Sequence, residues 1–468
     1  MARKVFLTVL GTGFYEPCRY KINNFTSQNT RYIQIATIDF LKVREWTAND
    51  AVIILLTEKA KETNWIKQEE GKRKKFNGEL VEYITLQQQI NEAGLPMEPT
   101  IVDIPEGQNE EEMWSIFQKL YGVIQNGDEL YIDLTHSFRY IPMMMMVFSN
   151  YAKFLKGVKV KSVTYGNFEA FKNKEAETGF IVDITSLSVL QDWTAGADEF
   201  ISSGRVDKLR GNYIPQLDEK NKASGYKDRD VQQQMSLVTR LDNVVSDLIT
   251  CRGINIVEGA LFKSLHGSLD KVMKATTPEP FKPLLEKISD SFKDFKDTQD
   301  VQNGIKAARW CFEHKLYQQC ITTLRESIDT LICNCVKKDC PMVDFHSETW
   351  RDCSSYAYHN LLNGINAEKS KVPEDGETKK IKKQGCTPAE EEADSKRRRD
   401  KYLPVIEKMM SLSLWEVIKP EEVDSFRNLR NDINHCGMRN SPANAKTVID
   451  KIEEFLIYLE ERIKIVLA

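Results

Sequence analysis

The first third of the chain alternates short apolar runs, rich in β-branched residues, with segments whose apolar residues have helical spacing. The apolar runs occupy residues 4–10, 51–57, 99–104, 129–134 and 158–165. The helical segments between them include residues 32–40, 80–87 and 113–121. Strands that alternate with helices in this way form parallel sheets covered by helices on both faces. We therefore predict an α/β, Rossmann-like domain with a parallel sheet, and an edge hairpin from residues 166–167 and 180–183.

The remainder of the chain has helical spacing and lacks comparable β-rich runs, which predicts an all-helical second domain. Its first amphipathic segment is residues 187–201, and longer ones follow at residues 232–251, 256–275, 280–295, 301–315, 316–336 and 442–467. We expect an α/β domain at residues 1–186, a helical linker at 187–215 and a helical domain at 216–468.

Residues 364–402 interrupt the helical pattern, because they hold hardly any apolar residues and several clusters of like charge. The basic clusters are at residues 379–383 and 397–399. Such a composition is typical of a mobile, solvated insertion, and this is our expectation for the segment. The alternative is an arm whose basic clusters steer RNA.

Length and composition fit a globular protein of two domains, with 468 residues, 41% hydrophobic and 29% charged. The longest apolar stretch, residues 140–154, contains polar residues and predicts a core helix, with the run at residues 143–146 packed inside. We expect neither a membrane partner nor a signal peptide, and hence a cytoplasmic protein. The net charge of −4 neither favours nor excludes a nucleic-acid partner.

The ten cysteines are expected to stay reduced in a chain of this kind. Cys333, Cys335, Cys340 and Cys353, with His346 among them, are candidates for a zinc site. Their spacing matches no paired CxxC arrangement, and Cys333 falls within an apolar helical segment, so we expect no metal ion and no cofactor.

Two predicted strand ends carry loops suited to a ligand, since parallel sheets bind ligands beyond the carboxyl ends of their strands. The first loop is Gly11-Thr12-Gly13, whose glycines allow a ligand to approach the backbone. It lacks the third glycine of the dinucleotide fingerprint, so NAD and FAD are not expected. The second loop, residues 133–139, offers hydroxyls, an imidazole and a guanidinium from Thr135, His136, Ser137 and Arg139. These donors suit a phosphate or a purine edge, although Thr135 or Ser137 also serves simply to cap the next helix.

The sequence Asp133-Leu134-Thr135-His136-Ser137-Phe138-Arg139, placed after the fourth strand, resembles the signature of the CARF domain (CRISPR-associated Rossmann fold). Gly11-Thr12-Gly13 is similar to the first-strand loop of that family. The resemblance implies that these two loops, from two protomers, hold a cyclic oligoadenylate across a dimer axis. Many members have glycine where this chain has Ser137.

Near the end of the chain, Arg430 is followed after four residues by His435, and this spacing resembles the motif of HEPN ribonucleases. The same spacing occurs at Arg309 and His314. There the intervening residues are apolar and predict a buried helix face. Between Arg430 and His435 the residues are mostly polar, and only this segment predicts a surface that a phosphate can reach.

The HEPN resemblance implies a role for each residue of the second segment. His435 would assist attack by the RNA 2′-hydroxyl or protonate the leaving 5′-oxygen, and Arg430 would hold the scissile phosphate. Asn431 would orient one of these groups. Cleavage would be metal-independent, would leave a 2′,3′-cyclic phosphate, and would use a symmetric dimer. A structural alternative is a solvated helix in which Arg430 pairs with Asp424 or Asp432.

Together the resemblances imply an endoribonuclease that cyclic tetra- or hexa-adenylate activates to cleave single-stranded RNA in type III CRISPR antiviral defence. The implied assembly is a homodimer or a larger oligomer. Two alternatives remain open. The first is a CARF regulator with a non-catalytic helical domain, and the second is a CARF domain that also degrades its own activator.

Overall fold

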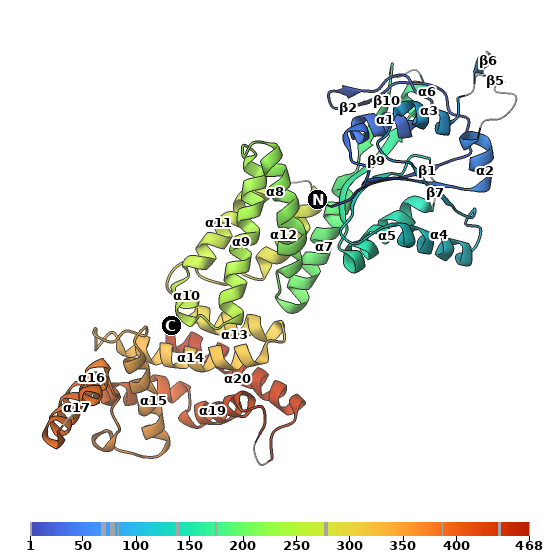
Figure 1. Ribbon diagram of the computed structural model, residues 1–468. Coiled ribbons are helices and arrows are strands. Elements are labelled where there is room, and N and C mark those ends of the chain that lie inside the picture. The colour runs from blue at the N-terminus through green and yellow to red at the C-terminus, as the bar shows by residue number, and fades with distance from the viewer. Residues whose placement is uncertain are drawn as a thin grey trace. The chain divides into compact units, whose positions relative to one another are not determined.

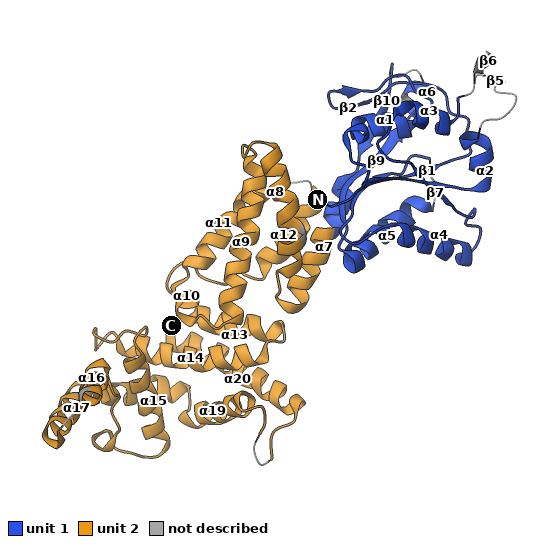
Figure 2. Cartoon of the chain, in the orientation of Figure 1, with its two compact units in different colours: residues 1–191 blue, residues 192–468 orange. Residues whose placement is uncertain are grey.

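The computed structural model describes residues 2–66, 72–74, 80–82, 84–136, 140–173, 176–275, 279–385, 387–438 and 441–467. The chain divides into two compact units, residues 1–191 and residues 192–468 (Figures 1 and 2). The first unit is an α/β domain, and the regular secondary structure described in the second is helical. The predicted fold class is therefore confirmed.

The first unit is built on an eight-stranded, mostly parallel sheet with the strand order β3-β2-β10-β9-β8-β1-β4-β7. Neighbouring strands in the run from β9 to β7 are parallel, β10 is antiparallel to β9, and the short β2 and β3 extend the edge. The strands are β1 Lys4–Leu10, β2 Tyr20–Ile22, β3 Phe25–Thr26, β4 Ala51–Leu56, β7 Thr100–Asp103, β8 Glu129–Asp133, β9 Lys159–Asn167 and β10 Gly179–Asp183. All five predicted strands and the edge hairpin of β9 and β10 are present.

Helices cover both faces of this sheet, so its central strands are buried on both sides (Figure 1). The helices α4 Glu110–Val123 and α5 Ile141–Lys156 share one core with Val5, Leu7 and Val9 of β1. The helices α1 Ile33–Phe40 and α3 Leu86–Ala93 share the other core with Phe6 and Leu10. This two-sided burial is why the strands have continuous apolar sequences instead of alternating ones.

Two local predictions in the first unit are wrong. Residues 80–87 are not one helix, because β6 Leu80–Glu82 pairs with β5 Lys72–Lys74 and α3 begins only at Leu86. The four methionines at residues 143–146 do not all pack inside. Met145 is buried, whereas Met143 is 73% exposed, because one helix turn carries neighbouring residues to different faces.

The second unit consists of helices (Figure 1). They are α8 Ile214–Ala223, α9 Arg229–Ile249, α10 Gly253–Glu258, α11 Ala260–Lys274, α12 Lys282–Asp290, α13 Gln302–Glu313, α14 Tyr317–Val336, α15 Glu348–Leu362, α16 Gly376–Gln384, α17 Pro388–Met410, α18 Leu414–Val417, α19 Pro420–Asn434 and α20 Ala445–Leu467. Helix α7 Thr185–Ser203 begins in the first unit and ends in the second. Within the residues that the structure describes, no helix combines the length and the apolar composition needed to cross a membrane.

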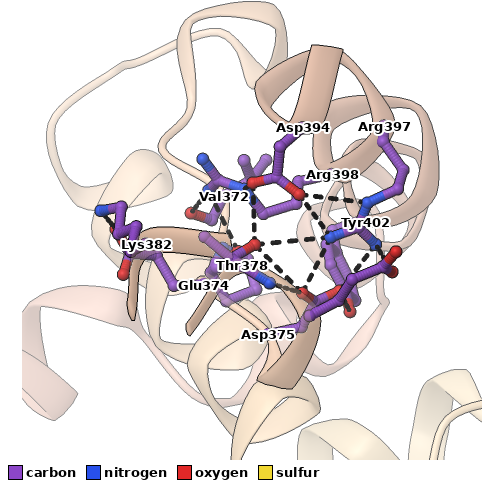
Figure 3. A network of polar contacts seen from close by, with 11 residues as sticks. Val372, Glu374, Asp375, Thr378, Lys382, Asp394, Arg397, Arg398 and Tyr402 are labelled. Carbon is purple, nitrogen blue, oxygen red and sulfur yellow. Dashed lines mark hydrogen bonds and ion pairs between the residues drawn. The ribbon is translucent and has the colours of Figure 1, made fainter. Parts of the chain in front are cut away.

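We expected residues 364–402 to form a mobile insertion. They instead fold into α16 and the first part of α17. Figure 3 shows the polar network that joins the two helices. Arg397 donates hydrogen bonds of 2.9 Å to both carboxylate oxygens of Asp375 and one of 2.7 Å to Asp394. The buried Tyr402 donates a further hydrogen bond to Asp375. The charges of the segment thus pair with one another, and the arginine neighbours Arg398 and Arg399 also bind groups within it.

Candidate functional site

Two loops meet at the carboxyl edge of the sheet, where β1 and β8 lie side by side. They are residues 11–13 after β1 and residues 134–136 after β8. A Cβ atom on Gly11 would lie 2.7 Å from the carbonyl oxygen of His136 and 2.5 Å from the hydroxyl oxygen of Tyr15. Both distances are shorter than real contacts of a Cβ atom. Glycine at position 11 is therefore what allows the loops to approach each other.

The second loop is fixed by Asp133, a buried carboxylate at the end of β8. It accepts a hydrogen bond of 2.7 Å from the hydroxyl of Thr8 and one of 2.5 Å from the hydroxyl of Thr135. The Thr135 hydroxyl in turn accepts a hydrogen bond of 2.8 Å from the N–H of Gly166 on β9. Desolvation raises the pKa of Asp133 above its ordinary value. Asp133 and Thr135 thus tie three adjacent strands together beneath the loop.

His136 presents a neutral imidazole at this edge. Its ring stacks on Tyr15, with ring centroids 3.9 Å apart and an interplanar angle of 27°. Burial lowers the pKa of His136 to about 3, so the ring carries no charge near neutrality. The Nε2 atom is buried and has no hydrogen-bond partner among the described residues. One polar atom of the loop is therefore left for a group that these residues do not supply.

Asn64 is a structural part of the site that our sequence analysis missed. It is fully buried in the π-helical turn Lys61–Trp65, and its side-chain amide donates hydrogen bonds of 2.8 Å and 2.9 Å to the carbonyl oxygens of Gly11 and Gly13. The guanidinium of Arg31 similarly donates a hydrogen bond of 2.6 Å to the carbonyl oxygen of Tyr15. The first loop is thus held in shape from beneath by two side chains distant in sequence.

The structure places five predicted ligand-binding residues in these two adjacent loops. They are Gly11, Thr12, Gly13, Thr135 and His136. The other two, Ser137 and Arg139, lie outside the described residues. The part of all seven residues in ligand binding stays a prediction.

The second candidate site lies at the C-terminal end of α19 in the helical unit. Arg430 and Asn431 are half-buried in the last turn of the helix, and His435 is exposed directly after it. The Nε atom of Arg430 is buried without a hydrogen-bond partner among the described residues. Asp424, one of the two carboxylates proposed as a structural partner of Arg430, instead forms an ion pair of 2.5 Å with Arg427. The described residues thus leave Arg430 with an unmet hydrogen-bond donor.

The backbone after α19 explains why His435 reaches the surface. Cys436 and Gly437 have φ angles of 56° and 65°, a left-handed conformation that ends the helix. The N–H of Gly437 donates a hydrogen bond of 2.8 Å to the carbonyl oxygen of Asp432, and Asp432 is 3% exposed. Phe426 stacks on Phe455 of α20 with a centroid distance of 4.0 Å. The inner face of α19 is anchored, and its C-terminal end presents polar groups.

The second occurrence of the spacing, at Arg309 and His314, flanks a buried helix face, as predicted: Trp310 and Cys311 are buried, His314 is buried and Arg309 is half-buried. Arg309 donates hydrogen bonds of 2.8 Å and 2.5 Å to the two carboxylate oxygens of Glu460 on α20. His314 is 7% exposed, lies 2.7 Å from the carbonyl oxygen of Trp310, and has its pKa lowered by burial. Both side chains are occupied by structural contacts.

Metal ligands are not grouped in the described parts of either unit: no three His, Cys, Asp or Glu side chains there lie close enough together to hold an ion. Of the cysteines considered for zinc, Cys333 and Cys353 are buried in α14 and α15. Burial raises the pKa of Cys333 to about 12, which favours the protonated thiol over the thiolate that binds zinc.

Comparisons with known proteins match a family model within the first unit and a longer part of the chain in one relative. Residues 5–169 match the family described as CRISPR system endoribonuclease Csx1, CARF domain. The CRISPR-associated protein MJ1674 of Methanocaldococcus jannaschii is 27% identical over 238 residues, which are 48% of this chain and 33% of that protein. The chain thus covers about a third of that relative's length.

A solved structure is similar over nearly the whole chain. It is Enterococcus italicus Csm6 bound to cyclic hexa-2′-fluoro-hexa-dAMP, at 9% identity and a TM-score of 0.41, with 99% of this chain and 94% of the other covered. The family match and the sheet with its two loops agree with the resemblance found in the sequence. Residues 5–169 match the CARF domain of that family, as the resemblance in the sequence implied.

Proposed function

We propose that the protein is an endoribonuclease that cyclic oligoadenylate activates in CRISPR-associated defence. The observation that carries the proposal is the combination of a CARF domain with an open Arg430–His435 segment elsewhere in the same chain. In this proposal the helical unit is a HEPN ribonuclease domain, and single-stranded RNA is its substrate.

The loops of the CARF domain would bind the activator. Gly11 and Gly13 bring backbone close to the ligand, and the neutral His136 offers a hydrogen-bonding nitrogen to a base or a ribose. Thr135 uses its hydroxyl to fix the strands, so we assign it a positioning role. Arg139 and Ser137 would contact the phosphates, as the family resemblance implies.

A symmetric pair of CARF domains would place two copies of these loops around one ring. Helix α5, which starts five residues after His136, has an exposed apolar stripe of Met143, Val147, Tyr151 and Phe154. Val147 is 63% exposed and Phe154 is 87% exposed. Large exposed apolar side chains at helical spacing are typical of an interface, and a second copy supplies the same stripe. We propose that α5 of one protomer packs against α5 of its partner.

Each helical unit would contribute Arg430, Asn431 and His435 to RNA cleavage. His435 would transfer a proton to or from the reacting oxygens, because an imidazole can act as a general acid or a general base. Arg430 would hold the scissile phosphate with its guanidinium. Asn431 would orient one of these groups. The expected product carries a 2′,3′-cyclic phosphate, because the 2′-hydroxyl is the nucleophile, and we propose that no metal ion takes part.

The test is cleavage of a labelled single-stranded RNA with cyclic tetra-adenylate, with cyclic hexa-adenylate and without either. We expect one of the two rings to accelerate cleavage by the wild type, and His435→Ala to remove the accelerated cleavage. His346→Ala, an exposed histidine outside α19, is the control and should cleave like the wild type. Absence of cleavage with either ring would leave the alternative of a binding regulator. Shortening of the ring without RNA present would indicate a CARF domain that degrades its activator.

A further inference from the structure

A groove between α9 and α11 collects basic side chains without any acidic ones. It is a hollow of about 460 Å³ within the helical unit, and the two helices lie side by side in Figure 1. Its four cations are Arg229 and Arg240 on α9 and Lys263 and Lys271 on α11. None of the described residues that line it is Asp or Glu. The neutral lining residues are Gln232, Gln233, Ser236, Ser264, Gly267 and Ser268.

The lining residues follow one stripe on each helix, so the groove is a continuous feature of the packed pair. On α9 they recur at intervals of three and four residues from 229 to 240, and on α11 from 263 to 271. The helices run in opposite directions, since Arg240 contacts Ser264 near the start of α11. Arg240 and Lys263 therefore lie at one end of the groove and Arg229 and Lys271 at the other.

The hydrogen bonds of Arg240 that line the groove are made with uncharged groups and not with a carboxylate. Its Nε atom donates a hydrogen bond of 3.0 Å to the hydroxyl of Ser236, and its Nη1 atom donates one of 3.2 Å to the carbonyl oxygen of Ser264. Both partners are uncharged, and no described carboxylate forms an ion pair with any of the four cations. A half-buried guanidinium that is held only by neutral groups keeps an unbalanced positive charge and can bind an anion.

The length of the groove selects an extended anion over a small one. Arg240 comes eleven positions after Arg229 on α9, and this corresponds to about 16 Å along a helix. A single phosphate cannot contact cations at both ends, whereas two or three consecutive phosphodiesters of a nucleic-acid strand can. The serine and glutamine side chains between the cations can donate to phosphate or sugar oxygens at any sequence.

We propose that this groove binds the backbone of single-stranded RNA at a distance along the chain from Arg430 and His435. The identity of the strand as RNA rests on the proposed function. The groove would hold a substrate that extends beyond the cleavage site and would raise the affinity for long RNAs without contributing to the chemistry. It would contact the strand mainly at its phosphates, and such contacts carry no sequence information.

The test is fluorescence anisotropy with a labelled 20-nucleotide single-stranded RNA and the full-length His435→Ala protein, which does not require cleavage. We expect Lys263→Glu together with Lys271→Glu to weaken binding at least about tenfold in 0.1 M salt, and to lower the slope of log K against log salt by about 1.4. The control is Lys220→Glu with Lys287→Glu, which reverses two exposed lysines outside the groove and should change affinity less than twofold.

Equal affinity of the groove variant and the control variant would overturn the proposal. Displacement of the RNA by poly-L-glutamate at equal charge concentration would also overturn it, because the groove would then fit an acidic protein. The measurement separates this proposal from the proposed function. Binding that depends on the groove without any activated cleavage would refute only the nuclease, and activated cleavage with groove-independent binding would refute only the groove.

Discussion

The two candidate sites differ in how many of their polar groups form hydrogen bonds within the protein. At the CARF loops, the buried Asp133 and Asn64 and the half-buried Thr135 are hydrogen-bonded to neighbouring strands and loops. At the end of α19, His435 is exposed and Arg430 keeps an unpaired donor among the described residues. The first site is a rigid frame that a ligand completes, whereas the second presents free groups to a substrate. Substitutions should therefore affect stability at the first site and activity alone at the second.

The largest expected effect is the loss of cleavage in Arg430→Gln, because a neutral amide cannot offset the phosphate charge in the transition state. We expect activated cleavage to fall by about two to three orders of magnitude. The melting temperature should stay close to that of the wild type, since Arg430 has no ion pair among the described residues. Single-turnover cleavage and differential scanning fluorimetry check the two parts. A lowered melting temperature together with unchanged cleavage would mean that Arg430 has a structural role.

The matched substitution Arg309→Gln should show the opposite pattern. Arg309 has the same spacing to a histidine but forms two hydrogen bonds with Glu460. Leaving that carboxylate without its partner should cost about 1–3 kcal/mol of unfolding free energy. Cleavage per folded molecule should be unchanged. The free energy of unfolding is measured by urea unfolding followed by tryptophan fluorescence, and activity by the cleavage assay. Loss of activity in Arg309→Gln without loss of stability would contradict the distinction between the two arginines.

At the CARF loops, Thr135→Val should lower both stability and activator affinity. The substitution removes the donor to Asp133 and the acceptor for the N–H of Gly166, so we expect a loss of about 1–3 kcal/mol. Calorimetric titration of the activator and thermal unfolding measure the two effects. Thr100→Val, at the exposed start of β7 and outside both loops, is the control for the loss of a hydroxyl. Unchanged unfolding in Thr135→Val would contradict the account of a rigid frame.

The smallest expected effect is a pH dependence of stability from the closed histidine His314. Burial lowers its pKa, so the folded state disfavours the proton that the unfolded state binds below about pH 6.5. Stability from this group is complete above that pH and is lost as the pH falls below it, by at most about 1.4 kcal/mol per pH unit. Between pH 7.5 and 5.5, His314→Phe should lose less stability than the wild type. An equal loss in both proteins would assign the effect to other groups.

The sequence allowed the sheet to be predicted because its central strands are buried on both faces and are therefore continuously apolar. It misled at residues 80–87, where apolar residues at helical spacing belong to a short strand and a turn. The signal that could have corrected this was present: Thr85 and Gln88 form a capping box that marks the true start of α3. A second capping box, at Thr387 and Glu390, likewise marked α17 within residues 364–402.

The site was only partly predictable for a different reason. The glycine loop and the residues after β8 lie in sequence motifs, so their types and spacing were informative. Asn64 and Arg31 support the first loop from elsewhere in the chain, and nothing in their local sequence marks that role. Contacts of this kind depend on tertiary packing, which spacing does not encode. The same limit applies to Arg309 and Arg430, which have equal spacing to a histidine, although Arg309 pairs with Glu460 and Arg430 forms no ion pair among the described residues.

The most direct test of the account is to measure activator binding and RNA cleavage together in His435→Ala and in Gly11→Ala, with one control variant. Gly11→Ala places a Cβ against Tyr15 and the His136 carbonyl, and Gly122→Ala, whose Cβ would meet open space, is its control. We predict that His435→Ala binds the activating ring like the wild type and does not cleave RNA. We predict that Gly11→Ala loses both binding and activated cleavage, and that Gly122→Ala retains both. Activated cleavage by His435→Ala, or by a Gly11→Ala protein that no longer binds the ring, would contradict the account.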